Sequence, residues 1–331
     1  MVTVILVVVV LLALGFDFIN GFHDTANSIA TSVSTRVLTP RIAIVMSACL
    51  NFLGALTSEK VADTIAKGIV KGNVEQYVIV AALIGAITWN LLTWLIGIPS
   101  SSSHALIGSL TGAAIAFAGS FHIILWNDIL NKVILPLLTS PVVGFVIGFA
   151  VMKFLYFILR SVSLRMVNAL FSKFQILSAA LMAYSHGNND AQKSMGIITL
   201  ALVSAGLIGP NAGVPLWVKI ACALSMAVGT SVGGWKIIKT VGVDMIKLHP
   251  VGGFAAETSS AAVIQVMTAM GAPVSTTQVI SSAIMGVGAS KRLSAVNWGI
   301  VKNIAWTWLL TIPCTMVLGA IATLIVRLLV H

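Results

Sequence analysis

The chain has 331 residues, of which 58% are hydrophobic and only 8% are charged, and its mean hydropathy is +1.04. Soluble globular proteins carry about 25% charged residues, so this composition excludes a water-soluble fold. The net charge of +10 does not indicate nucleic acid, because most basic residues fall between apolar blocks, as the positive-inside rule predicts. The blocks are continuous rather than alternating, which predicts membrane-spanning helices instead of barrel strands.

The first half of the chain alternates apolar blocks with short polar segments. Apolar blocks lie at residues 2–20, 42–56, 77–96 and 133–159. A polar motif, Gly21–Ser28, follows the first block directly. Residues 57–76 are polar with mixed charge, which predicts a loop or an interfacial helix. Residues 105–119 are too short and too rich in Gly and Ala for a full span, and predict a hairpin or half-helix buried in protein.

The middle of the chain separates two halves of similar design. Residues 160–175 form the most basic connection without acidic residues, and we expect this connection on the cytoplasmic side. We therefore divide the chain into a first membrane repeat, 1–159, the connection, and a second membrane repeat, 176–331. Apolar blocks of the second repeat lie at residues 196–207, 216–234, 254–270 and 296–330. The last block is longer than one span needs, so we expect tilt, a bend or two segments there.

Two motifs recur in the same order in the two halves. The polar motif of residues 21–28 returns at 187–194, with its aspartate in register. A proline followed by three hydroxyl side chains occurs within residues 97–104 and again within 271–278. Paired halves with corresponding broken segments are typical of secondary transporters. The sequence therefore predicts an all-α polytopic membrane protein, made of two inverted repeats with broken helices and re-entrant hairpins.

The aspartates of the polar motif are candidate cation ligands. Asp24 and Asp190 each follow a glycine by three residues, and a charge in the bilayer centre costs at least about 2.5–3.5 kcal/mol. Glycine permits a helix to break, and the freed carbonyls beside a carboxylate suit Na⁺ or a proton. The alternative is helix capping outside the membrane. The candidate cation-binding residues are Asp24, Asn27, Asp190, Gln192 and Glu257, with Asp24 and Asp190 as the Na⁺ candidates.

The Pro-Ser-rich pair is a candidate anion site. Proline is tolerated in the first turn of a helix, and Ser or Thr can cap the helix. Free N–H groups and the positive end of the helix dipole bind anions, so two such N-termini can hold one tetraoxyanion. Ordinary capping at a membrane boundary is the alternative. The candidate phosphate-binding residues are Ser101, Ser102, Ser103, Ser275, Thr276 and Thr277.

Four further side chains are candidates for a proton or anion role. They are His186, Lys193, His104 and Gln278. Histidine can carry a proton or simply be a hydrogen-bonded core residue, and Lys193 places a cation inside the second polar motif. His104 and Gln278 occupy equivalent positions in the two halves. The chain has no Walker motif, nucleophile elbow or zinc motif, so we expect neither ATP binding nor enzyme activity, and no cofactor.

The chain resembles the inorganic phosphate transporter (PiT) family over nearly its whole length. The residues that carry the resemblance are 21–28, 186–193, 253–259 and 271–277. The resemblance implies a dimeric phosphate symporter with two inverted repeats, driven by Na⁺ or H⁺. It also implies that Asp24, Asn27, Asp190 and Glu257 belong to the ion and phosphate pathway, with the Ser/Thr clusters at re-entrant hairpins around the anion.

The pair Gln192-Lys193 and the residue Asn51 depart from part of the family. Many eukaryotic and archaeal-like members carry an Asn-Ala-like pair at the first position and an acidic residue near the second. The Gln-Lys form looks like the bacterial branch, in which H⁺ coupling with metal–phosphate substrates is found. Some bacterial relatives also carry sulfate.

The function predicted from the sequence is secondary active import of inorganic phosphate, free or as a metal–phosphate complex, with Na⁺ or H⁺ by alternating access. A sulfate permease on the same scaffold and a passive anion channel are the alternatives. A membrane enzyme acting on phosphate esters lacks a nucleophile–base constellation. We expect a multi-pass protein of the cell (inner) membrane that forms a homodimer in the lipid bilayer and binds no nucleic acid.

Overall fold

The computed structural model describes residues 2–70 and 74–330, and within these it is an all-helical bundle. The helices of the first half are α1 (Val2–His23), α2 (Thr25–Ser34), α3 (Pro40–Ala55), α4 (Lys60–Lys67), α5 (Gln76–Ile96), α6 (Ser102–Ala118), α7 (Trp126–Asp128) and α8 (Leu135–Leu159). Those of the second half are α9 (Leu164–Ser204), α10 (Leu216–Val232), α11 (Trp235–Lys239), α12 (Pro250–Ala269), α13 (Thr276–Lys291) and α14 (Trp298–Val330). Short 3₁₀ turns occur at Phe121–Ile123 and Leu293–Ala295, and π-helical turns at Ile129–Ile134 and Thr240–Asp244.

The helices are long and apolar enough for a multi-pass membrane protein, as predicted. Five described helical stretches qualify as spans: Val4–Ser34, Gln76–Ile96, Trp126–Leu159, Leu164–Ser204 and Trp298–Leu328. The number rises to seven if each of two bent pairs is one span, α3 with α4 and α10 with the segment 236–244. The shorter α6, Ser102–Ala118, is apolar and largely buried, which fits the half-helix expected there.

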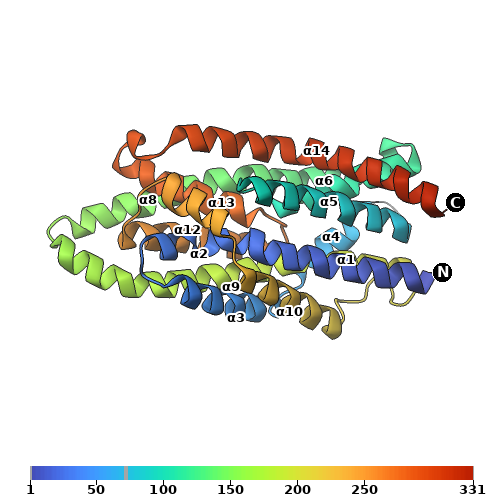
Figure 1. Ribbon diagram of the computed structural model, residues 1–331, viewed down its shortest axis with the longest axis horizontal. Coiled ribbons are helices and arrows are strands. Elements are labelled where there is room, and N and C mark those ends of the chain that lie inside the picture. The colour runs from blue at the N-terminus through green and yellow to red at the C-terminus, as the bar shows by residue number, and fades with distance from the viewer. Residues whose placement is uncertain (1, 71–73, 331) are drawn as a thin grey trace.

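Equivalent helices of the two halves run in opposite directions and pack across the halves. In Figure 1, α1 starts at the end of the bundle where both termini lie, whereas α9 starts at the opposite end, after the turn that follows α8. Helix α6 packs on α14, and its counterpart α13 packs on α8. In the same way α1 packs on α10, and α9 packs on α3. Each half therefore completes the core of the other.

Two apolar cores are stacked along the bundle, and the polar motifs lie between them. One core holds the first part of α1 and the last part of α9, for example Phe16 and Ile198. The other holds α2 and the earlier part of α9, for example Ile29 and Met182. The chain passes from one core to the other near residue 24 on one side and in residues 183–190 on the other.

The break predicted at the second polar motif is absent, which corrects one part of the sequence prediction. Helix α9 continues without interruption through Gly187 and Asp190, while the first motif is interrupted only at Asp24. The glycine serves close packing instead, because a Cβ on Gly187 would lie 2.3 Å from the Asn51 carbonyl oxygen. Gly21 likewise approaches the backbone of α10, where a Cβ would lie 2.4 Å from a carbonyl oxygen.

One element boundary also differs from the prediction, and the last apolar block is a single element and not two segments. The basic connection expected over residues 160–175 is mostly helix, because α9 begins at Leu164 and only 160–163 form the turn. The last apolar block is one helix, α14, with Pro313 inside it. A segment this apolar gains more from continuous backbone hydrogen bonding than from a break that would expose backbone groups to lipid.

Glycine contacts between α6 and α14 should be sensitive to any added side chain. A Cβ on Gly112 would lie 2.0 Å from the Met316 carbonyl oxygen, so Gly112→Ala should overpack the interface and destabilise the protein by about 1–3 kcal/mol. Gly15→Ala is the matched control, since a Cβ there meets nothing within 4 Å. Thermal unfolding in detergent compares the two, and equal midpoints for the two variants would contradict this packing.

Candidate functional site

The first polar motif forms a hydrogen-bonded cluster around the carboxylate of Asp24. Asp24 is buried at the junction of α1 and α2. The Ser102 hydroxyl donates to Oδ2 at 2.5 Å, and the Thr277 hydroxyl donates to Oδ1 at 3.1 Å. The His23 Nδ1 lies 2.7 Å from Oδ1. Asn27 donates from Nδ2 to Thr277 Oγ1 at 3.0 Å, so residues of both halves hold this carboxylate.

The second polar motif forms a matching cluster around Asp190, which is also buried. The Thr276 hydroxyl donates to Oδ2 at 3.1 Å, and Asn20 Nδ2 donates to the same atom at 3.4 Å. The Lys193 ammonium lies 2.8 Å from Oδ1, and His186 Nε2 lies 3.4 Å from Oδ2. Lys193 is only 1% exposed, so its charge is balanced inside the protein by this carboxylate.

The N-termini of α6 and α13 meet at the centre of the bundle. Ser101 accepts the His104 backbone N–H at 3.2 Å, and its counterpart Ser275 accepts the Gln278 N–H at 3.3 Å. Gln278 Nε2 donates to His104 Nδ1 at 3.1 Å. Because these two side chains occupy equivalent positions, their contact marks an approximate two-fold axis between the helices. The positive ends of both helix dipoles therefore point into one region.

Two of the predicted ligand residues are engaged elsewhere. Ser103 donates to the Val274 carbonyl oxygen at 2.8 Å, which ties one helix start to the other. Gln192 Oε1 accepts the N–H groups of Val61 and Ala62 at 2.8 and 3.3 Å, so this amide caps α4 instead of facing a carboxylate. Sequence spacing alone could not show that a helix start from the first half lies against Gln192.

Glu257 lies in a polar cluster of its own. Thr31 donates to Oε1 at 2.5 Å, Gln175 Nε2 donates to the same atom at 3.3 Å, and the Ser178 hydroxyl donates to Oε2. These donors come from α2 and α9, whereas Glu257 is on α12. No hydrogen bond among the described residues joins this cluster to either aspartate. Apart from Gln192, the predicted cation ligands are thus divided over three clusters, around Asp24, Asp190 and Glu257.

Asn51 connects the second cluster to its surroundings, which the sequence did not predict. His186 Nδ1 lies 3.1 Å from Asn51 Oδ1, and Asn51 Nδ2 donates to the hydroxyls of Thr25 and Thr230, both at 3.1 Å. Because the amide oxygen of Asn51 can only accept, His186 Nδ1 is the donor in this contact. An amide inside an apolar block was the available sequence signal.

Asp17 is a second residue that the motifs did not reveal. It is fully buried on α1, and in the part of the chain that the structure describes neither of its carboxyl oxygens has a hydrogen-bond partner. The Ser194 hydroxyl and the Cys222 thiol are its polar neighbours. A carboxyl group buried without donors is costly to ionise. The signal in the sequence was a single acidic residue near the end of a long apolar block.

Comparison with known proteins assigns a family to this arrangement. The model of the phosphate transporter family matches residues 20–166 and 160–319. A probable low-affinity inorganic phosphate transporter from Bacillus subtilis (strain 168) is 51% identical over 98% of both chains. A protein of the same description from Mycobacterium leprae is 45% identical over 98% of this chain and 78% of its own. A solved sodium-dependent phosphate transporter superposes with a TM-score of 0.88 at 26% identity, over 98% of this chain and 99% of that chain.

Ser101 and Ser102, at the start of α6, should respond differently to truncation. Ser101→Ala removes a cap and should lower stability by about 1 kcal/mol with little change in transport. Ser102→Ala removes a donor to a buried carboxylate, an interaction worth about 1.5–3 kcal/mol, and should lower transport by an order of magnitude or more. Uptake of labelled phosphate and thermal unfolding in detergent separate the effects. Full phosphate uptake by the Ser102→Ala protein would show that Ser102 is not part of the site.

Proposed function

Because the chain belongs to the phosphate transporter family, we propose that it is a secondary active symporter that imports inorganic phosphate with a coupling cation by alternating access. One observation carries the proposal. The starts of α6 and α13 meet at the centre of the bundle, and each presents a hydroxyl to a buried aspartate, Ser102 to Asp24 and Thr276 to Asp190. Helix starts suit an anion, and buried carboxylates suit a cation.

The phosphate would be bound by the two helix starts and the hydroxyls of Ser102, Thr276 and Thr277. His104 supports this placement, because it accepts from Gln278 at Nδ1 and its Nε2 has no hydrogen-bond partner among the described residues. That nitrogen then carries the proton and is a donor for a phosphate oxygen. Lys193 adds a positive charge near the second carboxylate.

The shared hydroxyls give a physical reason for coupling. A serine or threonine hydroxyl has one proton, so it donates to the carboxylate or to phosphate, but not to both. When Ser102 turns to phosphate, Asp24 loses a donor and its negative charge is free to attract a cation. In the second half, the Thr276 hydroxyl can likewise donate either to Asp190 or to phosphate. Each ligand then raises the affinity for the other, and the linkage is reciprocal.

The geometry favours H⁺ as the coupling ion. The positions beside both aspartates are filled by nitrogen groups of the chain, His23 at 2.7 Å and Lys193 at 2.8 Å. A proton can add to such a cluster without displacing them, whereas Na⁺ needs several free oxygen ligands. Na⁺ is the second candidate, because the structurally similar transporter is described as sodium-dependent.

Asp17 is our candidate for the residue that carries the coupling proton. Asp24, Asp190 and Glu257 each accept two or more hydrogen bonds that stabilise the ionised form, while Asp17 accepts none from the described residues. The titratable groups around it are Cys222 from α10 and Asp190 and Lys193 from α9. If Lys193 turns away from Asp190, the Lys193 ammonium needs another carboxylate. Asp17 can become that partner by losing its proton.

Transport in proteoliposomes tests the proposed function. An inward pH gradient, acidic outside, should drive accumulation of labelled phosphate above its equilibrium level, and an imposed Na⁺ gradient at equal pH should not. Flux that only runs down the phosphate gradient would indicate a passive channel. Sulfate that competes as well as phosphate would indicate a sulfate permease. Accumulation driven by Na⁺ alone would make Na⁺ the coupling ion and overturn our choice of H⁺.

Asp17→Asn should uncouple the proton from phosphate while leaving the anion site in place. We expect accumulation driven by the pH gradient to fall at least tenfold, while exchange of internal for external phosphate continues, because exchange needs no net proton movement. Asp63→Asn is the control, since Asp63 is an exposed partner of Lys67 and should leave both activities unchanged. Full pH-driven accumulation by Asp17→Asn would show that another group carries the proton.

Three further points belong to the proposal and rest on the sequence. The transported species is phosphate or its metal complex, the protein forms a homodimer, and it resides in the cell (inner) membrane. By the positive-inside rule we expect the turn that contains Arg160, and the start of α9 that contains Arg165, on the cytoplasmic side.

A further inference from the structure

A cavity of about 550 Å³ lies apart from the aspartate clusters, near the bundle end that carries the α8–α9 turn. Its walls come from α8, from the segment 243–252 that leads into α12, and from the segment 287–297 between α13 and α14. None of the residues that line it takes part in the clusters around Asp24, Asp190 or Glu257. The proposed transport function therefore leaves this cavity unexplained.

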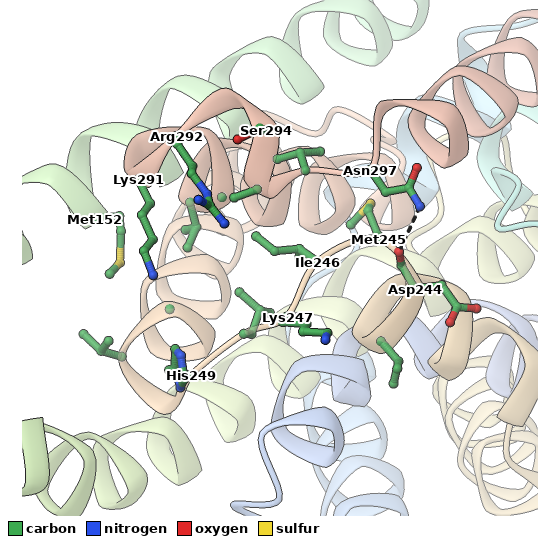
Figure 2. Close-up of a pocket in the computed structure, with 18 of the residues that line it drawn as sticks. Met152, Asp244, Met245, Ile246, Lys247, His249, Lys291, Arg292, Ser294 and Asn297 are labelled. Carbon is green, nitrogen blue, oxygen red and sulfur yellow. Dashed lines mark hydrogen bonds between the residues drawn. The ribbon is translucent and has the colours of Figure 1, made fainter.

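The cavity has a basic rim and an apolar floor. Figure 2 shows Lys247, Lys291 and Arg292 around one space, with His249 at its edge. In the described part of the chain these three cationic side chains make neither a salt bridge nor a hydrogen bond. Asp244 is the acidic residue of the lining. The floor is formed by Met152, Ile246, Leu248, Val251, Val287 and Val296. Free positive charges above apolar surface suit an amphiphilic anion.

The cavity borders the surface that α8 presents to lipid. Met152 and Tyr156 of α8 line it, and the same helix exposes Phe154 and Phe157 by 61% and 66% of their surface. Tyrosine is enriched at the membrane–water interface, which agrees with this position near the end of the bundle. An occupant with an acyl chain can therefore lie along α8 while its headgroup reaches the basic rim.

We propose that this cavity binds an anionic phospholipid, with the headgroup phosphate between Lys247, Lys291 and Arg292 and the acyl chains along α8. Basic pockets between membrane helices are recognised sites for anionic headgroups. Free inorganic phosphate shares the headgroup chemistry, but it has no apolar part to contact the apolar floor or the lipid beside α8. The bound lipid would join α8 of the first half to the start of α12 and the end of α13, and so stabilise the packing between the two halves.

Lipid binding to the purified full chain tests this proposal. Titration with a phosphatidylglycerol, followed by native mass spectrometry, should show saturable binding that phosphatidylcholine does not reproduce and that millimolar inorganic phosphate does not displace. The double variant Lys291→Gln/Arg292→Gln should bind about thirtyfold more weakly, since each cation near the membrane surface contributes about a factor of five. The single variant Lys247→Gln should bind about fivefold more weakly and serves if the double variant does not fold.

The control carries the same change of charge outside the cavity. Lys153→Gln/Arg165→Gln alters two exposed residues that do not line the cavity, and its affinity should stay within twofold of the parent. If the cavity and control variants lost the same affinity for phosphatidylglycerol, the effect would come from general surface charge. That result would overturn the proposed site. Displacement of the lipid by inorganic phosphate would make the cavity a phosphate site instead. Transport assays do not enter this test, so its outcome is independent of the proposed function.

Discussion

The need to satisfy buried carboxylates determines the arrangement at the centre of this protein. Asp24 and Asp190 are almost fully buried, and each is held by a hydroxyl from a helix start in its own half, Ser102 and Thr276. Thr277 crosses between the halves to reach Asp24. Removing one partner of a buried charge costs several kcal/mol, so these hydroxyls fix the positions of α6 and α13 as firmly as the apolar contacts do. The starts of both helices are therefore held in place by their bonds to the buried aspartates.

The two halves differ in the group that balances each carboxylate. The first half uses the imidazole of His23, and the second uses the amino group of Lys193, at 2.7 and 2.8 Å from the two carboxylates. His186 links the second carboxylate to Asn51, whereas His23 links the first carboxylate to Thr93. The two carboxylates of this approximately two-fold site are therefore inequivalent.

The sequence predicted the helical class from hydropathy and the hydroxyl residues at the two helix starts from capping, because both are local signals. It did not predict that α9 passes unbroken through Gly187, since a glycine that allows a break and a glycine that allows close packing look the same in sequence. Gln192 was placed with the cation ligands because it lies two residues from Asp190, but it caps α4. Long-range partners of this kind are set by tertiary packing.

The stacking of two apolar cores indicates where the protein would move in the proposed alternating access. Helices α1 and α2 pass from one core to the other at Asp24, and α9 does so close to Asp190, so the polar clusters form the layer between the cores. A polar layer has weaker shape-specific packing than the apolar layers, which behave as rigid units because small displacements in a dense core are costly. Relative movement of the two cores would therefore concentrate at Asp24 and Asp190. The hydroxyl bonds that join the layers would be the first to exchange when phosphate enters.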